Sequence, residues 1–329
     1  MAIPSVISSL VTVVYNMADT FFVGQTGDPL QVAAVSLTNP IFILFMAFAN
    51  MFGMGGSATA SIAMGEKNEK RMKNVSAFIT YASLITGIFF AVILLLGAKP
   101  ILQIFGADKQ TYDLAYGYLF HISYGTPFVI WSAAASFVVR AEGASKEAMI
   151  GSMIGTIVNI ILDPIMINGL HMGAAGAAIA TTIGNILASL YYAWYFIKKS
   201  KCFSIHPGYF KYKDKILTTV CSSGFPTAIF SVLMSVSTIV LNQILVVYGN
   251  APVAAIGIVF KANMFITFLQ MGLANEVQLI PLLYLLNAVA GIHGVIYGQA
   301  LTDYIAVILS TIIWKQYQNS ITKEKDSVK

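Results

Sequence analysis

Long apolar runs, separated by short charged loops, are the feature that most limits what this chain can fold into. Of its 329 residues, 57% are hydrophobic and only 10% are charged, whereas roughly a quarter of a soluble domain is charged. About 20 consecutive apolar residues are enough for a helix to cross a bilayer, and runs of this length favour helices over barrel strands. We therefore expect an all-α polytopic membrane protein. The expected spans lie near residues 2–24, 31–62, 74–97, 112–138, 147–168, 173–197, 216–248 and 252–276.

The charged loops predict the orientation of the chain in the membrane. Nearly all lysine and arginine residues lie on one side of the expected spans, in loops 65–73, 140–146 and 198–215 and in the tail after Trp314. By the positive-inside rule this side is cytoplasmic. We thus predict a cell-membrane protein whose N-terminus and basic C-terminal tail are both cytoplasmic. Because the net charge of +5 comes from these membrane-flanking loops, it does not indicate a nucleic-acid partner.

Two aspartates lie inside the expected spans, where a carboxylate is costly and usually marks an ion or substrate path. They are Asp19 in the first span and Asp163 in the fifth. Asn159 shares a helix face with Asp163, because residues four apart lie on the same side of a helix. Given the predicted orientation, Thr181 of the sixth span lies at the same depth as both aspartates, roughly 7 to 12 Å below the outer surface. Tyr15 stands one turn before Asp19.

These side chains predict a coupling-ion site for a proton or sodium. Pro164 directly follows Asp163, and proline bends a helix and releases backbone carbonyls. Together with two carboxylates, an amide and a hydroxyl, they provide the oxygen ligands that hard cations take. Each member alone also has a structural interpretation, because Asn159 and Thr181 can serve in helix packing and Tyr15 can serve as an interfacial anchor. Only their convergence in depth favours a site.

The second half of the chain reads as an incomplete repeat of the first. Residues 2–5 are echoed by 224–227 and residues 32–35 by 253–256, at offsets that agree within one residue. A later echo, of 176–185 by 294–303, has an offset about 100 residues smaller, so about three spans are missing. Residues 279–290 form only roughly 18 Å of helix, too short to cross the membrane. We expect nine or ten spans in total.

The expected domain organisation follows from this repeat. The sequence predicts an intact N-terminal six-helix bundle over 1–200, a cytoplasmic linker over 201–215, an incomplete C-terminal bundle over 216–314 and a basic tail over 315–329. The half that contains the predicted ion site is therefore the intact one.

Five stretches of the chain resemble one known family. Tyr15 to Gly24 (YNMADTFFVG) is similar to the first-helix signature of multidrug and toxic compound extrusion (MATE) transporters of the bacterial multidrug-efflux kind. Residues 140–143 (RAEG), 159–164 (NIILDP) and 173–181 (GAAGAAIAT) resemble the family's fourth to sixth helices. Residues 280–303 resemble its eleventh and twelfth helices, joined here directly to the eighth.

The resemblance implies two six-helix bundles around a central cleft and cation-coupled export of cationic or amphipathic drugs. It also implies an ion site at Asp19, Asn159, Asp163 and Thr181, which the depth argument reached separately, with Tyr15 nearby. No cofactor is implied beyond the coupling proton or sodium ion. The first-span and later polar residues that we expect to face the cleft are Tyr15, Asn16, Lys261 and Asp303.

Other functions remain open at this point. The shortened second half is compatible with a transport-dead relative or with one that needs a partner chain, and a lipid or polysaccharide flippase of related fold is a further alternative. An intramembrane aspartyl protease would also use two membrane aspartates. Such proteases place tyrosine before one of them and a glycine-rich turn before the other, whereas Ala18 and Leu162 stand there. We therefore predict a transporter and not an enzyme.

Overall fold

The computed structural model describes residues 21–210, 215–249 and 251–259 of the chain. Within them, six helices are long and apolar enough to cross a membrane. They are α2 (Pro29–Gly65), α3 (Glu69–Ile104), α4 (Tyr112–Ala141), α5 (Ser145–Asp163) with its extension η1 (Pro164–Gly169), α6 (Gly173–Lys198) and α7 (Ile216–Val246).

Local sequence explains where the first two of these helices begin. Asp28 precedes α2, and its carboxylate accepts a hydrogen bond from the Leu30 amide at 2.9 Å, with Pro29 in the first helical position. Asn68 caps α3 in the same way, accepting from the Arg71 amide at 3.0 Å. Side chains of this kind satisfy backbone donors that have no partner inside the helix. Both helices therefore start where a polar loop residue meets an apolar run.

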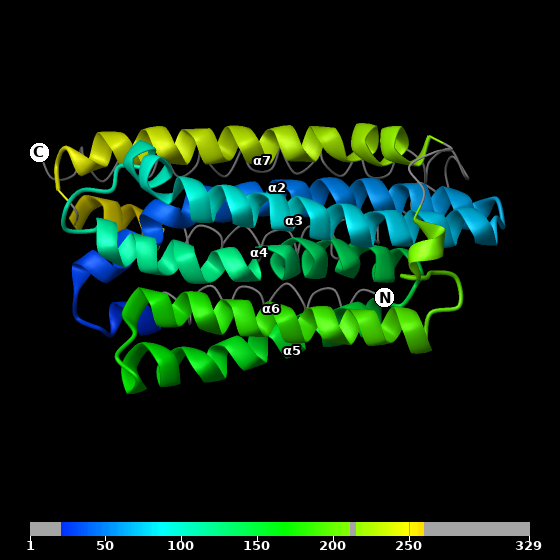
Figure 1. Cartoon of the computed structure of the whole chain (residues 1–329), viewed down its shortest axis with the longest axis horizontal. Coiled ribbons are helices and arrows are strands. Elements are labelled where there is room, and N and C mark those ends of the chain that lie inside the picture. The colour runs from blue at the N-terminus through cyan, green and yellow to red at the C-terminus, as the bar shows by residue number, and fades with distance from the viewer. Residues whose placement is uncertain (1–20, 211–214, 250, 260–329) are drawn as a thin grey trace, which may run out of the picture. The chain divides into compact units, whose positions relative to one another are not determined.

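The helices lie side by side with their axes roughly aligned (Figure 1). α4 is central and packs against α2, α3 and α6, while α5 packs on α6 and α7 packs on α2. Consistent with that position, most residues in the apolar stretch of α4 are buried, whereas only a minority are buried in those of α3 and α7. A multi-pass membrane protein leaves such apolar faces toward lipid, which is as apolar as the side chains themselves.

Charged loops gather at one end of these helices. At this end, which we call the basic end, α2, α4 and α6 finish and α3, α5 and α7 begin; it includes Lys67, Lys70, Lys146, Lys199 and Lys215. The remaining loops, at residues 25–28, 105–111, 170–172 and 247–249, lie at the opposite end. The helices thus alternate in direction, as the loop charges predicted.

The close packing of α2 against α7 depends on two glycines. A Cβ on Gly55 would lie 2.0 Å from the Val220 carbonyl oxygen, and one on Gly224 would lie 2.1 Å from the Met51 carbonyl oxygen. No side chain fits at either position, so the two backbones touch directly. Small residues are used for this purpose in membrane helix pairs.

The predicted fold class is confirmed, and the expected spans from 31 to 248 agree with α2 to α7. Two described segments are parts of other expected spans, because residues 21–24 and 251–259 are helical. The first span before residue 21, the short segment at 279–290 and the count of nine or ten spans lie outside the described residues.

Candidate functional site

Three of the predicted ion-site residues lie together between α5 and α6. Asn159 is 2% exposed, Asp163 0% and Thr181 3%. In the amide orientation that gives each atom a complementary partner, Asn159 Nδ2 donates to Asp163 Oδ2 at 3.0 Å, and Asn159 Oδ1 accepts from the Thr181 hydroxyl at 3.2 Å. Such an orientation is assigned from the hydrogen-bond network. Asn159 therefore bridges a membrane-buried carboxylate and a hydroxyl of the next helix.

Two glycines on the same face of α5 as Asn159 and Asp163 explain why these side chains can meet. Gly151, Gly155, Asn159 and Asp163 are spaced by four and so share one face of the helix. A Cβ on Gly184 of α6 would lie only 2.5 Å from the Gly155 carbonyl oxygen. With no side chain between them, α5 and α6 approach to backbone contact, which brings the Asn159 side chain within hydrogen-bond distance of α6.

The same face continues toward the basic end. There Gly151 leaves room for the ring of Tyr192, whose hydroxyl donates to the Ala148 carbonyl at 2.8 Å and lies 3.1 Å from Ser152 Oγ. Tyr192 is 1% exposed, so its hydroxyl must find partners inside the protein. The contact holds α5 against α6 on the other side of the Gly155 crossing.

Directly after Asp163 the helix changes its hydrogen-bond pattern. Pro164 begins η1, a π-helical segment that ends at Gly169, and the Leu170 amide donates to the Ile165 carbonyl at 2.8 Å. Proline has no amide hydrogen and cannot continue the α-helical pattern, and π-helical turns are often found at functional sites. Asp163 thus lies at the junction between two helix types, where the sequence predicted a bend at Pro164.

Two further polar residues, one on α6 and one on α4, extend the cluster, and the sequence analysis did not select them. Asn185 donates to the Thr181 carbonyl at 2.9 Å and accepts from Ser132 of α4 at 3.0 Å. Asn185 stands one turn after Thr181, so the four-residue spacing that linked Asn159 to Asp163 would also have found it. The polar contacts therefore join α4, α5 and α6.

The end of α6 nearest this cluster is fixed by a side chain of α2. Gln31 Oε1 accepts from the Ala174 amide at 2.8 Å, which satisfies a first-turn donor of α6. Gly173 has a φ of +54° beside it, a conformation that glycine adopts without strain. A Cβ at this position would lie 2.6 Å from Gln31 Oε1. The Gln31 side chain can therefore cap α6 only because residue 173 is a glycine.

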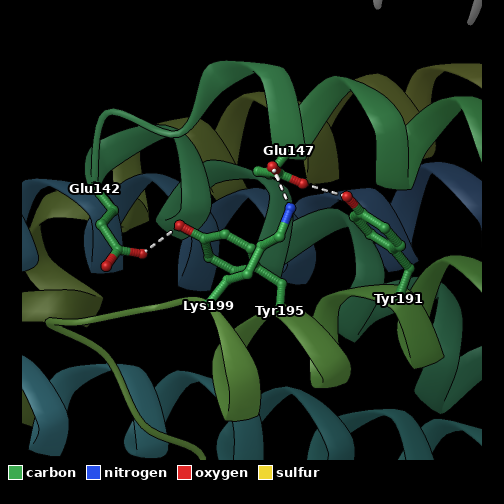
Figure 2. A network of polar contacts seen from close by, with 5 residues as sticks. All are labelled: Glu142, Glu147, Tyr191, Tyr195 and Lys199. Atoms are coloured by element: carbon green, nitrogen blue, oxygen red, sulfur yellow. Dashed lines mark hydrogen bonds and ion pairs between the residues drawn. The ribbon is translucent and has the colours of Figure 1, made fainter.

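A second polar network lies at the basic end of α5 and α6. Figure 2 shows the side chains of Glu142 and Glu147 directed toward two tyrosines of α6 and toward Lys199, which directly follows this helix. Lys199 Nζ lies 2.9 Å from Glu147 Oε1, Tyr191 donates to the other Glu147 oxygen, and Tyr195 donates to Glu142 at 2.7 Å. The Lys199 side chain is half exposed, so its ion pair with Glu147 contributes little by itself.

Glu142 also fixes the segment that follows α6. Its second oxygen accepts from the Ser200 hydroxyl at 2.8 Å and from the Lys201 and Cys202 amides at 3.1 and 3.2 Å. Burial raises the pKa of the Cys202 thiol, and the nearby carboxylate of Glu142 raises it further. The linker thus begins as an ordered strap against the bundle.

The strap continues across the end of α3. Ser76 exchanges two hydrogen bonds of 2.9 Å with the Ser204 backbone, and the Tyr81 hydroxyl donates to the Ile205 carbonyl at 2.9 Å. Phe210 then stacks on Phe78. These contacts join the linker to α3, which lies on the other side of α4 from α5.

Comparison with known proteins agrees with this arrangement of helices. The sequence model of the MatE family matches residues 4–165, which include α2 to α5 and the Asn159–Asp163 pair. The multidrug export protein MepA of Staphylococcus saprophyticus is 35% identical over 282 residues, which are 86% of this chain and 62% of that protein. The chain belongs to the MATE family. This MATE chain thus spans less than two thirds of the length of its curated relatives.

Solved structures of the family have the same fold. The MATE multidrug transporter DinF-BH, solved as a complex, has a TM-score of 0.78 at 30% identity, over 84% of this MATE chain and 63% of its own. An inward-facing multidrug resistance MATE transporter of the MOP superfamily also has a TM-score of 0.78, at 23% identity, over 95% of this chain and 69% of that one. The second likeness concerns the fold alone.

Several predicted site residues of the MATE chain lie outside the described residues. They are Tyr15, Asn16, Asp19, Lys261 and Asp303. The structure therefore brings together Asn159, Asp163 and Thr181. The roles predicted for these three residues and for the other five all stay predictions.

Proposed function

We propose that this protein exports small cationic or amphipathic drugs across the cell membrane in exchange for protons or sodium ions. The observation that supports this most is the 0% exposed Asp163 carboxylate, bonded to Asn159 inside a membrane-spanning helix. Buried carboxylates in membrane helices typically lie on ion paths. The names of the relatives, a multidrug export protein and a multidrug transporter, support the substrate class.

The coupling site in this proposal is the group Asp19, Asn159, Asp163 and Thr181. A carboxylate, an amide oxygen and a hydroxyl are suitable ligands for sodium, and the same carboxylate binds a proton. Because the proton and the metal ion compete for Asp163, occupancy by one excludes the other. The junction with η1 gives this segment a weak point at which a change at Asp163 can alter the direction of the helix.

The proposed orientation places the basic end in the cytoplasm, as loop charge suggests. Asp163 then lies near the outer end of α5, where external protons or sodium ions reach it first. Binding of the external cation would release the drug outward. The linker over 201–215 would join the N-terminal bundle to the second, incomplete bundle that begins with α7.

The test is dye efflux in a bacterial host that lacks its own multidrug pumps. Cells producing the wild-type chain should accumulate less ethidium than cells with an empty vector, and Asp163→Asn should restore full accumulation while the protein remains in the membrane. The matched control is Asp113→Asn, which removes an exposed carboxylate from the first turn of α4. It should export like the wild type.

Two results would reject the proposal as stated. Undiminished efflux by Asp163→Asn excludes Asp163 from coupling. Equal accumulation in wild-type and empty-vector cells excludes export by this chain alone. Collapse of the proton gradient with an ionophore, against removal of sodium from the medium, identifies the coupling ion.

A second candidate function follows from the incomplete repeat in the second half of the sequence. Because the echo at 294–303 has an offset about 100 residues smaller than the two earlier echoes, we also propose a partner-dependent or transport-inactive MATE relative as the alternative. Co-production with a separate MATE C-terminal half distinguishes the two forms of this alternative, since only a partner-dependent chain gains efflux.

A further inference from the structure

A basic cavity lies at the basic end, between the first turns of α3 and α7. Its volume is about 470 Å³. None of its described lining residues is acidic, and three are cationic. The polar residues that line it are Asn68, Lys70, Arg71, Asn74, Lys215 and Thr219. This cavity involves none of the residues of the Asn159 cluster.

Asn74 is the feature of the cavity that most requires a ligand. It is only 3% exposed, and within the described part of the chain its Oδ1 atom has no hydrogen-bond partner. An unsatisfied buried polar atom costs roughly 1–3 kcal/mol, so native structures rarely keep one without a reason. Because an amide can turn over, Asn74 can offer either its oxygen or its NH₂ group to a molecule in the cavity.

Arg71 also has a buried polar atom with no hydrogen-bond partner among the described residues. Its Nη1 atom lies 3.0 Å from Glu66 Oε2, but its Nε atom is buried without a partner among the described residues. Lys70 and Lys215 are exposed and have no described ion-pair partner. One guanidinium donor and two ammonium groups therefore remain available at one small cavity.

The N-terminus of α7 adds to the positive potential. Within the described part of the chain no side chain caps this 31-residue helix, and the position where Ser, Asp or Asn is preferred is occupied by Lys215 with a φ of 59°. The first amides of a helix have no partner within it. Together with the helix dipole they attract anions, phosphate groups above all. A lysine at the cap position strengthens this attraction, whereas an aspartate would cancel it.

We propose that this cavity binds the phosphate of an acidic phospholipid headgroup in the leaflet at the basic end. Arg71 Nε, the two lysines and the α7 amides would donate to the phosphate, and Asn74 would bond the polar group esterified to it. A lipid fits better than free phosphate because α7 continues from the cavity with exposed apolar side chains, Leu217 at 44% and Phe225 at 56%. Basic pockets between membrane helices are known lipid headgroup sites.

This site is independent of the proposed export function. It would exist in an active transporter and in an inactive one, because it requires only that α3 and α7 lie together. A bound lipid would hold these two helices in contact, since its phosphate would interact with both.

The test measures lipid retention by native mass spectrometry of the full chain in detergent. The chain is incubated with phosphatidylglycerol or phosphatidylcholine that have identical acyl chains. The wild type should retain one phosphatidylglycerol, and Lys70→Gln/Lys215→Gln should weaken that binding about 30-fold, which corresponds to about 1 kcal/mol for each lysine. Both lysines are exposed, so the variant should fold.

The matched control is Lys146→Gln/Lys198→Gln, which removes two charges at the same end but outside the cavity. It should retain phosphatidylglycerol like the wild type. Equal loss in both double variants, no loss in either, or equal retention of phosphatidylcholine would overturn the proposal. Displacement of the lipid signal by inorganic phosphate at about 50 mM would also overturn it, because the site would then be one for a free anion.

A third variant tests the buried amide. Asn74→Asp puts a negative charge beside the expected phosphate and should weaken phosphatidylglycerol binding further, with no such effect on phosphatidylcholine. Undiminished phosphatidylglycerol retention by folded Asn74→Asp would contradict the role of this residue. Circular dichroism before the lipid measurement shows whether this variant has folded.

Discussion

The crossing of α5 and α6 at Gly184 offers the sharpest test of how the Asn159 cluster is built. In Gly184→Ala the added Cβ would lie 2.5 Å from the Gly155 carbonyl oxygen, whereas ordinary contact begins at 3.4 Å. The obstacle is backbone and not a flexible side chain, so it cannot rotate away. The two helices must therefore separate locally by about 0.9 Å.

The cost can be worked out from two opposing effects. Overpacking of this kind costs about 1–3 kcal/mol, while replacing a helical glycine with alanine gains about 0.5–1 kcal/mol. The net loss is thus between about 0 and 2.5 kcal/mol, with a midpoint of about 1.2 kcal/mol. A loss at this midpoint lowers the melting temperature by about 2–5 °C. The same separation lengthens the 3.2 Å contact between Asn159 and Thr181 to about 4 Å, beyond hydrogen-bond range.

The assay is thermal unfolding of the purified chain in detergent, followed by circular dichroism, with dye efflux measured in parallel. Gly117→Ala is the matched control, because its Cβ would meet only the Ala175 side chain at an ordinary 3.7 Å. That variant should be as stable as the wild type or slightly more stable. If Gly184→Ala melts at the same temperature as Gly117→Ala, the reasoning about backbone contact is refuted.

Three further outcomes follow from other contacts. Glu142→Gln should speed alkylation of Cys202 by N-ethylmaleimide several-fold in a Cys221→Ser background, because the substitution both releases the strap and lowers the pKa of the thiol. The control Glu66→Gln should leave the alkylation rate unchanged. Equal rates in the two variants would contradict the proposed role of Glu142 in holding the strap. In the wild-type strap, the raised pKa of Cys202 keeps the thiol protonated, so its alkylation rate should still rise at pH values where that of free cysteine has levelled off; a pH profile like that of free cysteine would exclude the shift. Gln31→Leu removes the cap of the Ala174 amide and should lower the free energy of unfolding by about 0.5–2 kcal/mol, measured by thermal unfolding. The Gln103 side chain has no described hydrogen bond, so the control Gln103→Leu should have no such effect. Equal melting temperatures of the two variants would count against the cap.

The sequence alone predicted the helices and part of the site because both depend on simple periodicities. Apolar run length predicts where α2 to α7 lie, and the charged loops predict which ends of these helices lie on the same side. The four-residue spacing and the common depth of Asp163 and Thr181 predicted that these residues lie in one layer. The contact of Asn159 with Thr181 agrees with that prediction as far as position is concerned, and its function stays a proposal.

The sequence could not predict which helices lie next to one another in the plane of the membrane. Depth along the membrane normal follows from residue counting, but which helices touch depends on where small residues allow backbones to meet. Gly155 and Gly184 determine the α5–α6 pairing, and nothing in either helix alone identifies the other. Contacts such as Gln31 with Ala174, or Glu142 with Lys201, join residues far apart in sequence and have no periodic signal.

Gly55 of α2 contacts the backbone of α7, and Gly184 of α6 contacts the backbone of α5. These two contacts predict how the stability of the helix pairs depends on temperature. Apolar helices in lipid gain nothing from the release of water when they pair, so these crossings depend on dispersion and on weak contacts to carbonyl oxygens. Hydrophobic stabilisation weakens on cooling, whereas dispersion contacts do not depend on water in this way. The pairing of α2 with α7 and of α5 with α6 should therefore persist at temperatures low enough to loosen the core of a water-soluble protein.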